Sequence, residues 1–316
     1  MELPVSLIQS IEALASGSKV SDLQKAAQRL SERYRDSKRS GQPLLSDRTE
    51  AAAYAITRMP ATYGAVYSAL NWAMEHTDCQ PRTLLDVGAG TGAATWAAHE
   101  QFPLEQIICM EKESSMKAQG QALMAGTELE KAQWISGDVT SSLEQKADLV
   151  IASYVLNEVS PAQRPSAVQR LWDATEQLLL LVEPGTPAGF EQLRSIRQQL
   201  LSLGANMVAP CPHREICPIT GDDWCHFSCR VPRSRLHRQL KGGEVPYEDE
   251  KFAYLLVSRQ PASPCQARVL RHPLIETGRV TMELCSVDGK NKTMFRKKDA
   301  AYKQARKADC GDSIKL

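Results

Sequence analysis

The stretch LLDVGAGTGAATWAA, residues 84–98, predicts a strand, a glycine-rich turn and a helix in direct succession. An apolar run ends at Asp86, glycines follow at positions 88, 90 and 92, and small residues of high helix propensity come next. Glycine permits a positive φ and lets a ligand approach the backbone closely. This order is typical of a ligand site at the carboxyl end of a strand, but a glycine-rich turn alone does not identify the ligand.

Around this turn, strands and helices are predicted to alternate. The expected strands are Arg82–Val87, Gln106–Glu111, Lys131–Ser136, Ala147–Tyr154 and Gln177–Glu183, and the expected helices lie at about 92–101, 113–124 and 161–175. Such alternation predicts an α/β fold with a doubly wound, mostly parallel sheet, whose strands end at one ligand-binding edge. We expect an N-terminal helical region over 1–76, the α/β domain over 77–260 with a cysteine-rich insertion at 205–235, and a small basic β module over 261–316.

Side chains at the ends of successive strands are the candidate cofactor-binding residues. Glu111 is placed to bind ribose hydroxyls and Asp138 to accept from an adenine amino group. The predicted set is Asp86, Gly88, Ala89, Gly90, Gly92, Glu111, Asp138, Val139 and Tyr154. The set resembles that of the class I S-adenosylmethionine-dependent methyltransferases, whose first motif is similar to residues 85–92. A nicotinamide-binding motif more often has a third glycine where this chain has Ala93, so S-adenosylmethionine is the favoured cofactor.

Nine cysteines are an unusual number, and four of them crowd into a short segment: Cys211, Cys217, Cys225 and Cys229. Clustered cysteines in a reducing compartment point first to a metal site. The gaps are wider than those of paired zinc ligands, which favours an iron–sulfur cluster over zinc. The spacing alone leaves the fourth ligand open between Cys229 and Cys285. Prolines at 210, 212 and 218 exclude a regular helix in this segment.

Longer motifs allow a family to be named. They are PATY at 60–63, LDVGAGTG at 85–92, VEPGTPAGF at 182–190, APCPH at 209–213, DWCHFS at 223–228 and EDEKFAYL at 248–255. With these motifs the chain resembles, from about residue 58 to about residue 309, the methyltransferase-like ribosomal small-subunit assembly family, found in bacteria and as the Rsm22-type factor of mitochondrial ribosomes. The resemblance implies a 4Fe-4S cluster held by Cys211, Cys217, Cys225 and Cys285. It also implies association with the small ribosomal subunit and its rRNA.

Two dense basic segments agree with an RNA partner. One contains Arg230, Arg233, Arg235, His237, Arg238 and Lys241; the other contains Lys290, Lys292, Arg296, Lys297, Lys298, Lys303, Arg306 and Lys307. In a chain whose net charge is only +1, such segments predict a one-sided basic surface that binds phosphates.

Methyl transfer itself is not predicted by any single motif, and the catalytic residues are unknown. Many amino-group methylases of nucleic acids carry an Asn/Asp-Pro-Pro-aromatic loop after the fourth strand, whereas this chain has Asn157-Glu158-Val159 there. Cys211 could serve as the nucleophile of a cytosine methylase, but its place among metal ligands argues against that role. Two hypotheses follow: an RNA-binding assembly factor without methyl transfer, or an active rRNA methyltransferase.

Composition sets the remaining expectations. A hydrophobic content of 42% and a charged content of 24% are ordinary for a globular protein. No apolar run approaches the roughly 18 residues of a membrane span, and the N-terminus lacks the basic start of a secretory signal. We therefore expect no membrane association, a cytoplasmic location, and a monomer away from the ribosome.

Overall fold

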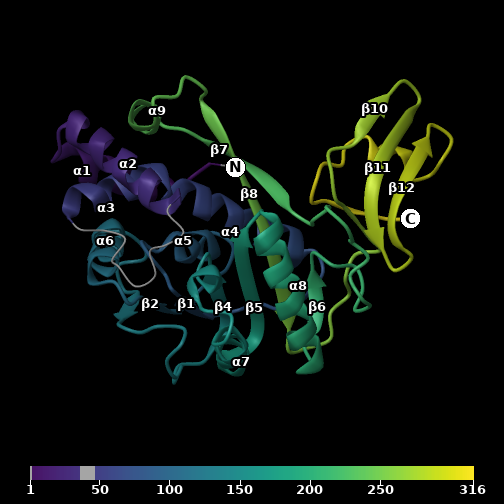
Figure 1. Ribbon diagram of the computed structural model, residues 1–316, viewed down its shortest axis with the longest axis horizontal. Coiled ribbons are helices and arrows are strands. Elements are labelled where there is room, and N and C mark those ends of the chain that lie inside the picture. The colour runs from purple at the N-terminus through teal and green to yellow at the C-terminus, as the bar shows by residue number, and fades with distance from the viewer. Residues whose placement is uncertain (1, 36–46) are drawn as a thin grey trace.

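The computed structural model describes residues 2–35 and 47–316, in which a central sheet is flanked by helices (Figure 1). The strands of this sheet are β1 (Thr83–Val87), β2 (Gln106–Met110), β3 (Gln133–Ile135), β4 (Ala147–Ser153), β5 (Thr175–Pro184), β6 (Asn206–Ala209), β7 (Phe227–Pro232) and β8 (Tyr247–Ser258). The helices are α1 (Val5–Ser16), α2 (Val20–Arg35), α3 (Arg48–Thr57), α4 (Met59–Met74), α5 (Ala93–His99), α6 (Ser114–Met124), the short 3-10 turn η1 (Leu156–Glu158), α7 (Arg164–Ala174), α8 (Pro187–Ser202) and α9 (Arg235–Lys241).

The sheet has the strand order β3-β2-β1-β4-β5-β8-β6, with β7 paired to β8. Strands β1 to β5 pair in parallel, and β8 runs antiparallel to β5 and β6. This arrangement confirms the predicted doubly wound, mostly parallel sheet of the class I methyltransferase type. All five predicted strands occur near their predicted positions. Strands β1, β4 and β5 are apolar runs buried on both faces of the sheet, whereas the edge strand β3 is short and partly exposed.

Alternate side chains of the central strands pack into two separate cores. On β5, Leu178, Leu180 and Val182 face α4 and α5, whereas Leu179 and Leu181 face α7 and α8. The first core continues into α1, α2 and α3, so the N-terminal helices share the core of the sheet. Successive side chains of a strand point to opposite faces of the sheet. The alternation along β5 therefore determines which side chains pack against which helices.

Strand β8 is longer than its neighbours, and its two halves pair with different strands. Its carboxyl half pairs with β6, its amino half pairs with β7, and β5 runs beside its residues 252–258. The chain between β6 and β7, residues 210–226, is an irregular loop with three prolines. The cysteine-rich segment thus begins at one sheet strand and ends at another, next to the middle of β8.

The C-terminal part forms its own small antiparallel sheet beside the main domain (Figure 1). Its elements are β9 (Ala267–Val269), β10 (Leu274–Glu276), β11 (Arg279–Ser286), β12 (Gly289–Arg296), α10 (Tyr302–Ala305) and β13 (Ser313–Ile314). The β11–β12 hairpin turns at Val287-Asp288, directly before Gly289, whose φ is +100°. In the described ranges 2–35 and 47–316, none of the helices combines the length and apolar character needed to cross a bilayer.

Candidate functional site

The turn after β1 is an open cradle at the carboxyl edge of the sheet. The amides of Gly88 and Ala89 donate to the carbonyl oxygen of Met110 at 2.9 and 3.0 Å, which fixes the start of the turn to β2. Gly90 has a φ of +56°, and a Cβ added to it would meet no atom within 4 Å. Gly92 then precedes α5. A left-handed backbone beside open space is the geometry that a closely approaching ligand needs.

Glu111 holds this turn from the end of β2. Its Oε2 accepts a hydrogen bond from the Gly90 amide at 2.7 Å, and its Oε1 accepts one from the Glu113 amide at 2.8 Å. Burial raises the pKa of Glu111, although both amides act in the opposite direction. Each carboxylate oxygen retains a second lone pair that can accept a ligand hydroxyl.

Asp86 lies beneath the turn. It is fully buried, and its Oδ2 accepts from the amide and the hydroxyl of Thr95 at 3.1 and 2.7 Å. Burial raises the pKa of Asp86 to about 7, with the two Thr95 bonds opposing the shift. Because these bonds join β1 to α5, Asp86 orders the cradle from below.

Asp138 and Val139 occupy the turn after β3. The Asp138 Oδ1 accepts from the amide and the hydroxyl of Thr140, both at 2.7 Å, and Lys112 Nζ lies 3.7 Å from Oδ2. Burial opposes ionisation of Asp138, but Thr140 and Lys112 together hold its pKa below the ordinary value. Val139 is buried against the strands. Asp138 is therefore an anion near neutral pH at the same edge as Glu111.

Tyr154 has a strained backbone at the end of β4. Its φ is +58°, the one positive φ of a non-glycine residue in the described part of the chain. Its amide donates to the Val182 carbonyl oxygen at 2.7 Å, and its hydroxyl donates to Glu250 Oε1 at 2.9 Å. Burial and the adjacent Glu250 raise the pKa of Tyr154 well above its ordinary value. Glu250, which the sequence reasoning did not single out, thus fixes the position of the Tyr154 ring.

Glu183, at the end of β5, is a second residue that the sequence reasoning missed. It is completely buried, and its Oε1 accepts from the Leu156 amide at 3.0 Å. Its Oε2 has no hydrogen-bond partner among the described residues. Burial raises its pKa to about 8, so the side chain is mostly protonated at neutral pH. The sequence signal that could have identified Glu183 as a site residue was its position at the end of the next predicted strand, β5.

For Glu183 we expect stability to fall as the pH rises from about 4 to about 8. The folded-state pKa of about 8 lies above the unfolded value of about 4.3, so the native state binds the extra proton in this window and loses that advantage as the pH passes 8. The slope is at most ~1.4 kcal/mol per pH unit for one proton. Denaturant unfolding from pH 5 to 9 measures it. Glu183→Gln should flatten the slope, leaving the part due to the other carboxyls whose pKa is raised, among them Asp86 and Glu111; an unchanged slope would refute the assignment.

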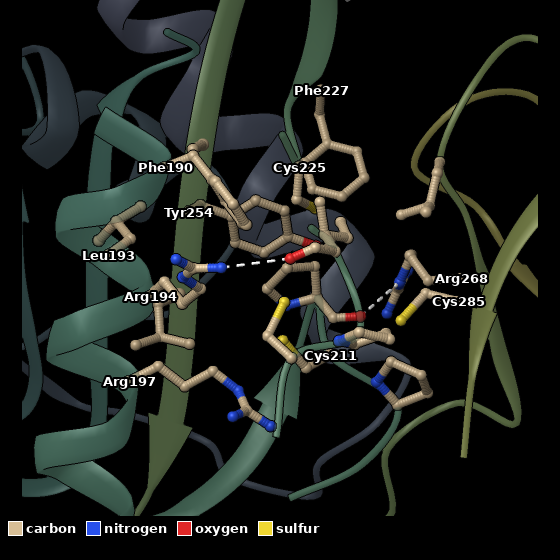
Figure 2. Close-up of a pocket in the computed structure, with 18 of the residues that line it drawn as sticks. Phe190, Leu193, Arg194, Arg197, Cys211, Cys225, Phe227, Tyr254, Arg268 and Cys285 are labelled. Carbon is tan, nitrogen blue, oxygen red and sulfur yellow. Dashed lines mark hydrogen bonds between the residues drawn. The ribbon is translucent and has the colours of Figure 1, made fainter. Parts of the chain in front are cut away.

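Four of the nine cysteines line one cavity between the sheet and the C-terminal module. They are Cys211, Cys217, Cys225 and Cys285. The first three come from the loop after β6, and Cys285 comes from β11. The cavity measures about 50 Å³, several times the roughly 10–15 Å³ that one water needs. Cys211 and Cys285 approach this space from opposite sides (Figure 2).

The four thiols interact with one another. Burial raises the pKa of Cys225 well above its ordinary value, and Cys211, Cys285 and Cys217 raise it further. All nine cysteines are free thiols. Cys229 does not line the cavity; it lies on β7, packs into the core with α4, and has Glu250 as its main charged neighbour. Within residues 2–35 and 47–316, no three His, Cys, Asp or Glu side chains are grouped tightly enough to hold a single metal ion.

Polar contacts of Asp223 and Trp224 attach the cysteine-rich loop, residues 210–226, to the surrounding elements. Asp223 accepts from Arg271 Nη2 at 2.6 Å and pairs with Lys290 of β12. Next to it, Trp224 Nε1 donates to the carbonyl oxygen of Gly185 at 3.0 Å. A Cβ on Gly185 would lie 2.7 Å from the backbone of residues 251 and 252, so glycine is required for this close approach. The DWCHFS and VEPG motifs thus meet beside the cavity.

The two basic segments differ in how much free charge they present. In the first, Arg230 pairs with Asp249, and Arg233 and Lys241 pair with Glu248. His237 is buried, which lowers its pKa to about 4 and leaves it neutral. In the second, exposed cations without an ion-pair partner in the described part of the chain are Lys292, Arg296, Lys297, Lys298, Lys303, Arg306 and Lys307. Unpaired exposed charge therefore lies mainly in the C-terminal module, whereas most of the first segment is paired or buried, contrary to the expected exposure of both segments.

Comparison with known proteins identifies relatives over most of the chain. The family described as mitochondrial small ribosomal subunit Rsm22 matches residues 48–315. The human mitochondrial ribosome assembly protein METTL17 is 29% identical over 83% of this chain, and a mitochondrial Rsm22-cox11 tandem protein of Schizosaccharomyces pombe is 24% identical over 84%. The chain spans 61% of the first relative and 43% of the second.

Among solved structures, a magnesium protoporphyrin IX methyltransferase of Synechocystis with bound S-adenosylmethionine aligns with a TM-score of 0.42 at 14% identity, over 72% of this chain and 90% of that one. The cytoplasmic location expected from the sequence is wrong, because the matching family and both curated relatives are described as mitochondrial.

Proposed function

Because the chain belongs to the Rsm22 family of the mitochondrial small ribosomal subunit, we propose that it is an assembly factor of the small ribosomal subunit that binds S-adenosylmethionine, a 4Fe-4S cluster and rRNA. The observation that carries the proposal is the convergence of Cys211, Cys217, Cys225 and Cys285 on one cavity, next to a module with many unpaired cations.

The donor set fits an iron–sulfur cluster. Four thiols from two separate parts of the chain surround the space, and a 4Fe-4S cluster is held by four separate thiolates at its corners. A cluster is larger than a single ion, so its ligands stand further apart than those of a zinc site. Buried donor groups without partners also border this space: Arg197 Nε, Arg268 Nη2, Tyr254 Oη and His213 Nδ1. When bound, the cluster supplies a cross-link between the loop and β11.

Anaerobic purification followed by iron, sulfide and zinc analysis tests this assignment. We expect about four irons and four sulfides per chain, as in other clusters of this type. A colourless protein containing one zinc per chain would refute the iron–sulfur part of the proposal and leave the RNA-binding part to be tested separately.

The cradle after β1 is the proposed S-adenosylmethionine site. Gly90 leaves open space for the ligand, Glu111 retains lone pairs for ribose hydroxyls, and Asp138 is an anion where the adenine would lie. Tyr154, whose hydroxyl donates to Glu250, ends the next strand, β4, and is the residue proposed to lie near the sulfonium. The sulfonium supplies an electrophilic methyl group when the cofactor is bound.

We expect Gly90→Ala to weaken S-adenosylmethionine binding by about tenfold or more, since the new Cβ costs roughly 1.4 kcal/mol or more of contact with the ligand. Gly126→Ala is the matched control, because Gly126 also has a positive φ, +70°, and open space around it but lies after α6. Both variants carry the same backbone strain of about 1–2 kcal/mol. Isothermal titration with the cofactor compares them. Equal affinities in the two variants would place the cofactor elsewhere.

An active rRNA methyltransferase is the second candidate function. The strained backbone of Tyr154, with a φ of +58° at the end of β4, favours it, because such strain is concentrated at functional sites. Methyl transfer requires an acceptor held in line with the sulfonium. Incubation with labelled S-adenosylmethionine and small-subunit rRNA or immature particles distinguishes the two candidates. No incorporation under conditions in which the cofactor binds would exclude the enzyme and leave the assembly factor.

A further inference from the structure

Two buried arginines border the cysteine cavity. Arg197, on α8, is 4% exposed, and Arg268, on β9, is 1% exposed. A guanidinium keeps its charge in any protein environment. Burying a charge is costly unless an opposite charge accompanies it. Two such cations beside one cavity therefore require an explanation.

Backbone carbonyl oxygens hold both guanidiniums. Arg197 Nη2 donates to the carbonyl oxygen of His213 at 2.8 Å. Arg268 Nε donates to that of Pro210 at 3.1 Å, and its Nη1 to that of Gly311 at 2.7 Å. In the described ranges of the chain, neither guanidinium has a carboxylate within ion-pair distance, although Glu75 acts on Arg268 from further away. The carbonyls orient the two groups but do not neutralise them.

Each guanidinium also has an N–H group that is not bonded to oxygen or nitrogen. Arg197 Nε and Arg268 Nη2 are both buried and lack a nitrogen or oxygen acceptor within the described residues. The neighbouring hydrogen-bonding groups are the thiols of Cys211 for Arg197 and of Cys265 for Arg268. Burial raises the pKa of Cys211, and both arginines oppose that shift, so their charges act on this thiol. Arg268 lies opposite Cys285 in the β9–β11 register, and Figure 2 shows the two side chains next to each other.

We propose that Arg197 and Arg268 are positioning residues for the cluster, which balance its negative charge, donate N–H···S hydrogen bonds to its sulfur atoms, and raise its reduction potential. The inference rests on the proposed 4Fe-4S cluster. Four thiolates around an oxidised core of two positive charges leave two negative charges, which two guanidiniums match. Hydrogen bonds to sulfur and local charge are among the factors that set the potential of such clusters.

The expected effect has a definite sign. One-electron reduction adds a negative charge to the site, so a neighbouring cation stabilises the reduced form more than the oxidised form. Removing one guanidinium therefore lowers the midpoint potential. We expect at least a tenfold fall in the ratio of reduced to oxidised cluster at a fixed applied potential, which corresponds to about 59 mV for a one-electron couple.

The test is a dithionite titration of the full chain, monitored by electron paramagnetic resonance, for the wild type, Arg197→Gln and Arg268→Gln. Arg194→Gln is the matched control, because Arg194 lies one turn away on α8 and lines the same cavity but is already paired with Glu191. The two test variants should shift to lower potential, and the control should not. Cluster-loaded Arg197→Gln and Arg268→Gln proteins with the wild-type potential would overturn the proposal.

A lysine variant covers the case in which a glutamine variant does not retain its cluster. Arg268→Lys keeps the charge but loses the two-point hold on Pro210 and Gly311. Iron retained in Arg268→Lys and lost in Arg268→Gln, with equal circular dichroism, supports the role of charge. Equal loss in both variants would show that Arg268 is only a structural brace and overturn the proposal. A wild type without iron and sulfide would instead refute the cluster itself.

Discussion

A Cys285→Ser protein purified without oxygen is expected to lose nearly all of its iron and sulfide. The three other proposed ligands come from one loop, and Cys285 is the one member of the four that comes from the C-terminal sheet. A serine hydroxyl is a hard, weakly acidic donor and binds the iron of a cluster much less well than a thiolate does. Iron and sulfide analysis, together with the visible absorption of the cluster, measures the loss.

The same substitution should also loosen the C-terminal module. Metal binding contributes directly to folding free energy when the ligands come from separate parts of a chain. The module would then keep its own core and the contacts of Asp223 with Arg271 and Lys290. It would lose the link to the loop that the proposed cluster provides. We expect faster limited proteolysis between residues 259 and 266, the segment that joins β8 to β9.

Two other buried cysteines provide matched controls for Cys285. Cys229 and Cys265 are 8% and 6% exposed, and neither lines the cavity. Serine at either position should leave the iron content unchanged. Wild-type iron in Cys285→Ser would refute this ligand, and loss of iron in Cys229→Ser would restore the alternative that the spacing left open.

The main sheet could be predicted from the sequence because its signals are local. The central parallel strands β1, β4 and β5 are short apolar runs, and the glycine turn after β1 marks the ligand edge. The position of Cys285 could not be derived in this way. It depends on the C-terminal sheet packing against the loop, a contact between segments about 70 residues apart, and Cys229 is equally compatible with the spacing.

A weaker signal for the two buried arginines was also available in the sequence. Arg197 falls in the apolar stripe of α8, with Leu193 and Leu200 on the same side, and Arg268 stands in the apolar run of β9. A cation at a core position calls for a buried partner. That both residues border the same cavity became visible only in the folded structure.

The sequence reasoning misjudged how much free charge the first basic segment presents, because the pairing of β7 with β8 decides which of its cations are neutralised. Arg230 lies directly opposite Asp249 in the β7–β8 register, and the two side chains form a two-point ion pair at 2.8 and 2.9 Å. Opposite charges facing each other across two strands stabilise the pair and cancel its field. The acidic residues lie in the sequence after the basic ones, and only the hairpin brings them together.

The unpaired cations of the C-terminal module lead to the second large expected effect. We expect Lys297→Glu combined with Lys298→Glu to reduce affinity for small-subunit rRNA by roughly thirtyfold or more at about 0.15 M salt, if each lysine neutralises one phosphate. Both side chains are exposed, in the turn between β12 and α10. The slope of log affinity against log salt should become shallower by about 2, because two fewer counterions are released. Filter binding at several salt concentrations measures both quantities.

A charge-matched control separates a local contact from an effect of net charge. Lys131→Glu combined with Lys146→Glu changes the net charge by the same amount, but these exposed lysines precede β3 and β4, at the end of the sheet opposite the cradle. If RNA binds at the module, the control should retain most of its affinity and its original salt slope, because a charge farther away than about 10 Å is largely screened at this ionic strength. Equal losses in the two double variants would mean that RNA responds only to overall charge, and the module would then have no special part in binding.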